Sequence, residues 1–309
     1  MLQCHRAMRI AVVHNPESGD DDHEAEHLIK PIRDAGHDVS YHPSRKGWEA
    51  SLNQALDLVV VAGGDGTVAE VARATVDRSI PMTILPMGTA NNIATWLGLS
   101  GVPVEALVAG WSRGTLQPFD LGLARGPWGT FQFLESIGVG LLAELMSEID
   151  EGASSYVNEL SRRETRISAA LGVMDRVLRR SNGIPCEIEL DDRRLSGEYL
   201  LIEVLNFGAA GPNLDLAPAA DCADGLLDVV LVEAHERALL EEHLAALHSG
   251  ARHVPHLPIH HARRVRLDYA PSCVHLDDEL WNDENALRGS VEATLRPKAL
   301  TFLVPRLED

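Results

Sequence analysis

The chain has 309 residues, of which 45% are hydrophobic and 24% are charged, and its formal net charge at pH 7 is −19. This composition excludes intrinsically disordered, collagen-like and low-complexity chains. A sequence pI near 5.1 argues against a broad nucleic-acid-binding surface, because neutralising phosphates requires clustered Lys and Arg. The length predicts about two domains, each with its own core.

The sequence is typical of a cytoplasmic protein. The first ten residues lack an apolar run long enough for a secretory signal, and no apolar stretch approaches the roughly 20 residues of a transmembrane helix. The four cysteines show no short repeated spacing, so we expect reduced structural thiols. The negative charge confines any peripheral contact with the inner membrane to a local apolar patch.

Strand and helix signals alternate in the first third of the chain. We expect strands at residues 9–14, 39–41, 56–62 and 82–85, and helices at about 23–35, at 68–75 and from about 90. The continuous apolar run at 56–62 suits a strand that is buried on both faces. This order predicts an α/β domain with a mainly parallel sheet.

The pattern changes after about Gly122. A strand is expected at 131–135, a long helical region at about 140–180, and further strands at 186–190, 198–205, 226–232, 265–269 and 299–304. The helical region carries an apolar stripe that we interpret as core: Leu160, Ile167, Leu171, Val173, Met174 and Leu178. The remaining strands predict a β-rich second domain.

The most informative motif is Gly63-Gly64-Asp65-Gly66-Thr67, which follows a predicted buried strand and precedes a predicted helix. Glycines let the backbone approach a ligand closely, and a helix N-terminus favours phosphate. Asp65 there requires a cation or a donor. The motif alone fits a phosphate-binding loop and a plain strand–helix turn equally well.

Two further loops strengthen the first interpretation. Residues 15–19 follow the first strand, and residues 86–92 follow the fourth. The carboxyl ends of parallel strands meet at one sheet edge, so we expect all three loops to line one nucleotide site. The sequence contains neither a G-x-G-x-x-G fingerprint nor a P-loop, which disfavours the ordinary dinucleotide and P-loop folds.

Two polar clusters look unremarkable when they are judged by residue type alone. Asp277-Asp278-Glu279 is then best interpreted as a solvated acidic turn. His256 and His260 have helical i, i+4 spacing, but Pro255 and Pro258 disfavour a helix there, so we expect a loop rather than a zinc site.

Taken together, the motifs Asn15-Pro16-Glu17-Ser18-Gly19, Gly63–Thr67 and Pro86-x-Gly88-Thr89-x-Asn91 resemble the diacylglycerol kinase catalytic-domain family. That family includes bacterial diacylglycerol kinases and other lipid kinases, and sphingosine and ceramide kinases. The resemblance continues through the second half of the chain, at residues 120–122, 206–208, 217–220, 224–228 and 275–279.

The resemblance implies a two-domain fold. Residues 1–122 would form the α/β ATP-binding domain, to which residues 296–309 return. Residues 123–295 would form a β-sandwich-like substrate domain with a helical insertion at about 140–180.

The resemblance also implies the roles of individual residues. Glu279 would accept the proton of the substrate hydroxyl, with Asp277 beside it, and Asp65 would supply a further catalytic carboxylate. Asp224 and the Leu226 carbonyl would bind Mg²⁺. ATP would be bound by Asn15, Pro16, Ser18, Gly19, Gly63, Gly64, Asp65, Gly66, Thr67, Gly88, Thr89 and Asn91. Asp278 replaces a glycine of the family, and a left-handed backbone there would be costly for Asp.

The leading hypothesis is an ATP-dependent kinase that phosphorylates a hydroxyl of diacylglycerol or a related amphiphile. One alternative is a kinase of a soluble metabolite with NAD-kinase-like chemistry, since such enzymes share the Gly63–Thr67 type of loop. The other is a non-catalytic regulator that binds a nucleotide or lipid. No nucleic-acid partner is expected, and the sequence is compatible with a homodimer.

Overall fold

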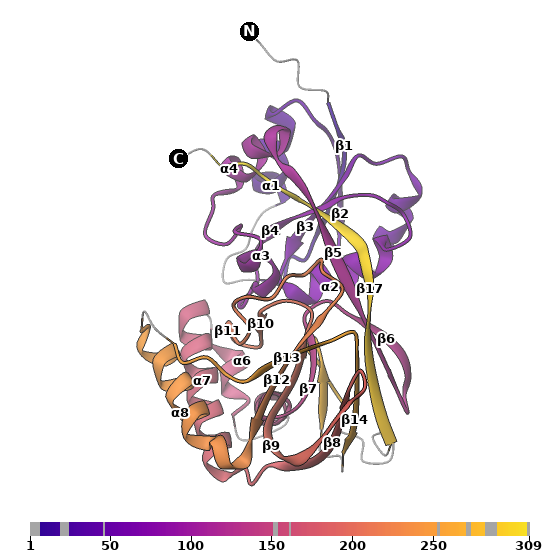
Figure 1. Ribbon diagram of the computed structural model, residues 1–309. Coiled ribbons are helices and arrows are strands. Elements are labelled where there is room, and N and C mark those ends of the chain that lie inside the picture. The colour runs from indigo at the N-terminus through magenta and orange to yellow at the C-terminus, as the bar shows by residue number, and fades with distance from the viewer. Residues whose placement is uncertain are drawn as a thin grey trace. The chain divides into compact units, whose positions relative to one another are not determined.

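The computed structural model describes residues 7–18, 25–45, 47–150, 154–160, 162–251, 254–269, 273–281 and 289–307 (Figure 1). It divides into two compact units. Unit 1 comprises Met1–Phe119 and Lys298–Asp309, and unit 2 comprises Asp120–Pro297.

Unit 1 is built on a parallel sheet with the strand order β2-β1-β3-β4. Its strands are β1 (Arg9–His14), β2 (Asp38–Pro43), β3 (Leu58–Gly63) and β4 (Met82–Pro86). Every residue of β3 is buried, as its apolar run predicts. The end of β17 (Gly289–Val304) adds a further parallel strand beside β4, where Phe302 pairs with Met82. The predicted mainly parallel sheet is therefore confirmed.

The helices of unit 1 occupy the segments that follow each strand of the sheet in the chain. They are α1 (Ala25–Asp34), η1 (Trp48–Asn53), α2 (Asp65–Thr75), α3 (Asn92–Trp96), α4 (Val104–Gly110) and η2 (Trp111–Arg113). Helix α2 begins three residues before its predicted start, because Gly64 is already the N-cap and its carbonyl accepts the Val68 N–H at 3.0 Å. Most of the Gly63–Thr67 motif is thus the first turn of the helix rather than a loop before it.

Unit 2 consists mainly of antiparallel strands in the order β16-β15-β7-β9-β8-β14-β17, with β12 paired to both β9 and β13. The strands are β5 (Thr115–Gly126), which begins in unit 1, β6 (Gly129–Phe133), β7 (Ser136–Gly140), β8 (Ile184–Leu190), β9 (Arg193–Leu205), β10 (Ala209–Ala210), β11 (Leu214–Asp215), β12 (Leu227–Glu233), β13 (Ile259–Ala262), β14 (Arg264–Tyr269), β15 (Val274–Leu276) and β16 (Glu279–Trp281). The strand predicted at 299–304 is the end of β17, which begins at Gly289.

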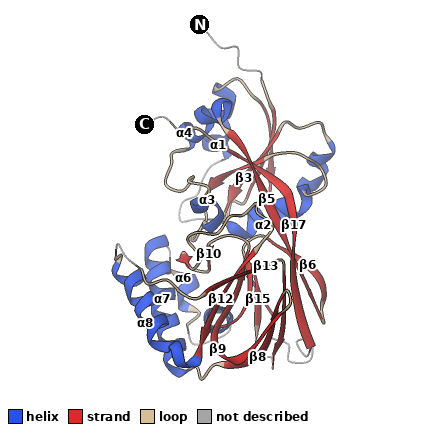
Figure 2. Cartoon of the chain, viewed as in Figure 1, coloured by secondary structure: helices blue, strands red, loops and turns tan. Residues whose placement is uncertain are grey.

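The helical region predicted at about 140–180 consists of three helices. They are α5 (Leu141–Asp150), α6 (Tyr156–Glu159) and α7 (Arg163–Arg180). The chain leaves helical geometry between the last two, because Leu160 and Arg162 are both extended. The sequence analysis missed α8 (Arg237–Ser249) and the short η3 (Ala234–Glu236) before it. Figure 2 shows α7 and α8 beside β9 and β12.

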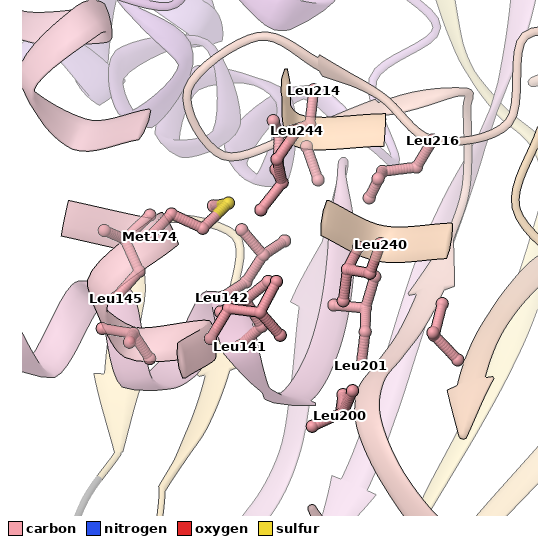
Figure 3. Packing of buried hydrophobic residues seen from close by; sticks show 14 of the residues in the cluster. Leu141, Leu142, Leu145, Met174, Leu200, Leu201, Leu214, Leu216, Leu240 and Leu244 are labelled. Atoms are coloured by element: carbon pink, nitrogen blue, oxygen red, sulfur yellow. The ribbon is translucent and has the colours of Figure 1, made fainter. Parts of the chain in front are cut away.

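The strands of unit 2 separate two hydrophobic clusters. On β9, Ile202 and Val204 belong to the cluster formed between strands, whereas Leu201 and Leu205 belong to the cluster beneath the helices. The helix-covered cluster includes Leu142, Met174 and Leu240 (Figure 3). The members of the predicted apolar stripe that lie on α7 pack into it, as expected for core: Ile167, Leu171, Val173, Met174 and Leu178. Leu160 follows α6 and does not belong to the cluster. Among the described residues, no helix combines the length and apolar character needed to span a membrane.

The pairing of β5 with β6 yields a test of the fold. Gly122 lies opposite the fully buried Phe133, and a Cβ at Gly122 would overlap its ring. Gly122→Ala should lower the free energy of unfolding by about 1–3 kcal/mol, since overpacking forces neighbours to move. The matched control is Gly172→Ala in α7, where no atom lies within 4 Å of the added Cβ. Equal urea midpoints for the two variants would contradict this packing.

Candidate functional site

Three loops of unit 1 lie at the same edge of its parallel sheet. His14 pairs with Ala62 and Gly63 pairs with Pro86, so β1, β3 and β4 end level with one another. The ladder continues into the loops, where Asn15 N–H donates to the Ala62 carbonyl at 2.9 Å and Met87 N–H donates to the Gly63 carbonyl at 3.0 Å. The structure thus brings the loops after β1, β3 and β4 together, as the sequence analysis expects.

Two glycines allow the second and third loops to touch. A Cβ on Gly64 would lie 3.0 Å from the Gly88 Cα, and a Cβ on Gly88 would overlap the Gly64 Cα. The two backbones therefore pack directly against each other. These glycines serve contact between loops, a role that the sequence argument about ligand approach does not include.

Side chains fix the three loops in place. The Asp65 carboxylate accepts the N–H groups of Asn92 at 3.0 Å and Ile93 at 3.1 Å, so it caps α3. Asn91, which is 5% exposed and has a φ of 53°, accepts the Gly88 N–H at 2.8 Å and donates to the Gly88 carbonyl at 2.7 Å. Asn15 Nδ2 donates to Thr67 Oγ1 at 3.3 Å. Asp65 thus has a positioning contact in addition to any catalytic one.

The other nucleotide-site candidates occupy the same loops. Gly63 is buried against the Thr67 side chain, Gly66 is the second residue of α2, and Ser18 and Thr89 are half-buried. Pro16 is exposed. Gly19 lies outside the described residues.

The acidic motif of unit 2 forms the turn of the β15–β16 hairpin. Leu276 pairs with Glu279, and Asp277 and Asp278 make the turn between them. Glu279 and Asp278 are exposed. The left-handed residue is Asp277, with a φ of 51°, rather than Asp278. The expected backbone cost at Asp278 therefore does not arise, and Asp is among the residues that tolerate this conformation.

The Asp277 carboxylate binds the segment that leads into β7, residues 134–136. Its Oδ1 accepts the N–H groups of Leu134 at 3.1 Å, Glu135 at 2.8 Å and Ser136 at 3.4 Å. Asp277 N–H in turn donates to the Ser136 carbonyl at 2.9 Å. The hairpin turn and residues 134–136 are therefore held as one unit.

Asn206 and Asp120 extend this polar junction. Asn206 is fully buried, and its Nδ2 donates to the carbonyls of Asp120 at 2.8 Å and Leu134 at 2.9 Å. The buried Asp120 carboxylate accepts the Gly225 N–H at 2.8 Å. Asn206 thus connects β5 to the segment that Asp277 holds.

The sequence analysis missed a buried acid–base pair beside the same turn. Glu203 and His275 are 0% and 2% exposed, and His275 Nε2 lies 2.9 Å from Glu203 Oε1. The sequence contains a clue to this pair, because Glu203 interrupts the apolar run of β9 and a charged side chain in a buried strand needs a partner.

The predicted metal ligands occupy a compact turn. Asp224 Oδ1 accepts the Leu226 N–H at 2.8 Å. Burial raises the pKa of the nearby Asp228 to about 6, His261 opposes this rise, and Asp224 and Asp221 add to it. The carboxylate and carbonyl oxygens are ligands of the kind that Mg²⁺ prefers. In the part of the chain that the structure describes, no three His, Cys, Asp or Glu side chains form a metal-binding group, so carbonyls and waters would complete the shell.

The described histidines that are close in sequence lie on three successive segments of the chain. His248 lies in the last turn of α8, His256 lies in the loop that follows, and His260 and His261 lie on β13. This agrees with the expectation that the segment around Pro255 and Pro258 is not helical.

Comparison with known proteins finds two family models along the chain. Residues 9–124 match the diacylglycerol kinase catalytic domain, and residues 143–304 match the YegS C-terminal NAD kinase beta sandwich-like domain.

Individual relatives carry names of the same kind. A diacylglycerol kinase of Bacillus subtilis (strain 168) is 26% identical, over 73% of this chain and 74% of the relative. A Xanthomonas euvesicatoria protein named "Probable lipid kinase YegS-like" is 34% identical, over 57% of this chain and 56% of its own length. A crystal structure of a diacylglycerol kinase from Bacillus anthracis str. Sterne superposes with a TM-score of 0.71 at 19% identity, covering 96% of this chain and 97% of that one, and so supports the fold.

Both domain models and the order in which they occur agree with the parallel sheet of unit 1 and the antiparallel strands of unit 2. The chain therefore belongs to the family that joins a diacylglycerol kinase catalytic domain to a YegS C-terminal NAD kinase beta sandwich-like domain.

Proposed function

We propose that this protein is a lipid kinase that transfers the γ-phosphate of ATP to a hydroxyl group of diacylglycerol or a related lipid. The observation that carries the proposal is the convergence of three small-residue loops at one sheet edge, in a chain of the diacylglycerol kinase family. The names of the relatives support a lipid rather than a soluble acceptor.

The loops after β1, β3 and β4 are the proposed ATP site. Helix α2 begins at Asp65, and the N–H groups in the first turn of a helix lack partners within that helix. Together with the helix dipole, such groups favour phosphate. The contacts of Asp65, Asn91 and Asn15 hold the loops in one arrangement before any ligand binds.

Glu279 is the proposed base for the acceptor hydroxyl. Its side chain is exposed at the start of β16, whereas Asp277 Oδ1 is engaged by three backbone N–H groups. The geometry therefore favours Glu279 as the proton acceptor and Asp277 as the residue that positions it. Phosphoryl transfer depends mainly on such positioning and on charge stabilisation.

Mg²⁺ bound to the phosphates of ATP would supply the positive charge that stabilises the transferring γ-phosphoryl group. Asp224 and the Leu226 carbonyl are proposed to hold a second, structural Mg²⁺ in unit 2.

Transfer of labelled phosphate from ATP tests the proposed function. The purified chain should label a total lipid extract, and it should not label an extract of soluble metabolites. Labelling of the soluble extract alone would favour a metabolite kinase. Nucleotide binding without labelling of either extract would favour a regulator.

The contact between Gly64 and Gly88 predicts a loss of ATP affinity in Gly88→Ala. The added Cβ must push the two loops apart. We expect the Kd for ATP, measured by calorimetry, to rise at least about tenfold, which corresponds to about 1.4 kcal/mol. Gly172→Ala is the control for a glycine replacement that adds no contact. An unchanged Kd in a folded Gly88→Ala protein would refute the assignment of these loops.

The proposed metal site predicts that Asp224→Asn loses its response to Mg²⁺. Asparagine keeps an oxygen for the Leu226 N–H, so the turn survives while the charge is removed. Asp221→Asn is a matched control, since Asp221 accepts the Ala223 N–H at 3.0 Å in a similar turn. Mg²⁺ should raise the melting temperature of the parent and of Asp221→Asn, but not that of Asp224→Asn. The same response in all three proteins would remove the site.

The role of Glu279 predicts that Glu279→Gln binds ATP normally but transfers phosphate slowly. Loss of a general base typically lowers the rate about 10²–10⁴-fold. Asp278→Asn removes an equally exposed neighbouring charge and should leave the turnover unchanged. Parental turnover in Glu279→Gln on the labelled lipid would exclude the role.

A further inference from the structure

A buried acid–base pair lies beside the turn that carries the proposed base. Glu203, Gly138 and His275 occupy one row across β9, β7 and β15, since Gly138 pairs with both of the others. Glu203 and His275 lie on the face of the sheet opposite to Ile202 and Val204, which belong to the hydrophobic cluster formed between strands. The pair is thus enclosed within unit 2.

Gly138 provides the space for the two side chains to meet. A Cβ at this position would overlap Glu203 Oε2 and lie 2.8 Å from His275 Nε2. Any other residue would place a side chain where the carboxylate and the ring make contact. The absence of a side chain on the middle strand is therefore what permits an ion pair between its two neighbours.

Both nitrogens of the His275 ring face acceptors. Nε2 lies 3.1 Å from Glu203 Oε2, and Nδ1 lies 3.2 Å from the Asp277 carbonyl. A neutral imidazole has only one N–H, whereas the imidazolium has two. Only a charged His275 can donate from both ring nitrogens to these two acceptors.

The surroundings favour this charge state. Burial alone disfavours the cation, but the charge and hydrogen bond of Glu203, together with the Asp277 carbonyl and charge, outweigh it and raise the pKa of His275. Helix α5 packs against β15, and two of its acids have other partners: Glu148 is paired to Arg180, and Glu144 interacts with Arg180 and Ser181. On the neighbouring strand β16, Leu280 is the residue opposite His275.

We propose that Glu203 and His275 form a positioning pair that fixes the Asp277 carbonyl, and through it the turn that presents Glu279 to the acceptor hydroxyl. This inference rests on the proposed function. The carboxylate of Asp277 is held by residues 134–136, its N–H by Ser136 and its carbonyl by His275, so the turn is fixed through all three polar groups of one residue.

A buried ion pair is better suited to orienting the Asp277 carbonyl than to stabilising the fold. Removing two charges from water offsets much of their attraction, so such pairs add little net stability, although removal of one partner is costly. The pair supplies direction, because the ring N–H donates well only to a carbonyl oxygen that lies close to the N–H axis, and this restricts the position of the Asp277 carbonyl.

Kinetics of His275→Gln and Glu203→Gln test the proposal. Each should lower kcat roughly 10- to 100-fold by misplacing the base, while the KM for ATP stays the same. The double variant should lose no more than the worse single variant, because the residues act as a unit. His243→Gln is the control, since His243 is also 2% exposed and bonds a backbone carbonyl, that of Pro255 at 2.8 Å. Parental kcat in the folded variants would overturn the positioning role.

Gly138→Ala displaces the pair without removing a titratable group. It should reproduce the loss of kcat, and it should speed amide exchange at Leu134, Glu135 and Ser136, whereas Gly172→Ala should do neither. Unchanged exchange would show that the pair does not hold the turn.

Nitrogen NMR of the His275 ring separates failure of the pair from failure of the proposed function. At pH 6.5, the ordinary pKa of histidine, the parent should show both ring nitrogens mainly protonated, and Glu203→Gln should show a mainly neutral ring. A neutral ring in the parent would overturn the proposal. If the parent phosphorylates no acceptor, the proposed function fails, while the NMR and exchange results still decide whether the pair fixes the turn.

The charge of His275 also predicts the direction in which its contribution to stability changes with pH. Because the pKa of folded His275 is raised, its contribution is fully present below its ordinary pKa of 6.5 and is lost as the pH rises through the higher, folded value. The difference in unfolding free energy between the parent and His275→Gln should therefore shrink from pH 6 towards alkaline pH. A difference that grows with pH would contradict a charged His275.

Discussion

Three successive N–H groups, of Leu134, Glu135 and Ser136, converge on one oxygen of Asp277, and the proposed acceptor chemistry depends on this contact. Backbone N–H groups that are buried need partners, and an ionised carboxylate is a strong one. The contact joins the β15–β16 turn to the segment that leads into β7, from which Asn206 continues to β5. Glu279 is thereby presented by a turn whose backbone is fixed from several directions.

In unit 1 a carboxylate also accepts several backbone N–H groups, and there the contact joins two loops. Asp65 accepts two N–H groups of α3, and this ties the first turn of α2 to the third loop. Gly64 and Gly88 then allow the two loops to touch, and Asn91 closes the third loop on itself. In both units a carboxylate from a short motif holds backbone N–H groups in place, and the proposed contacts with phosphate and with the acceptor hydroxyl are assigned to neighbouring groups.

Much of the fold could be predicted from local patterns. The strand Arg9–His14 is found at its predicted bounds, and the apolar run before Gly63 is buried throughout. Both could be predicted because the pattern of apolar residues along a short segment determines its strand periodicity and its burial. Strands β7, β15 and β16 were missed because they are short and owe their pairing to distant partners. The role of Gly138 could not be predicted, since it depends on Glu203 and His275 lying on either side of it in the folded sheet. Motif order pointed to Asp277 and Glu279, but which of them is engaged by backbone emerged only from the contacts.

The central claim is that Asp277 positions the turn while Glu279 takes the proton, and the turnover of Asp277→Asn compared with Asp277→Ala tests it most directly. The N–H groups of Glu135 and Ser136 reach Oδ1, and that of Leu134 lies 3.1 Å from both carboxylate oxygens. Asparagine keeps Oδ1 while losing the negative charge and the second oxygen. We expect Asp277→Asn to retain turnover within about tenfold of the parent, whereas the turnover of Asp277→Ala should fall by about 100-fold or more. An Asp277→Asn protein as inactive as Asp277→Ala would show that the charge of Asp277 is itself required, and would contradict this division of roles.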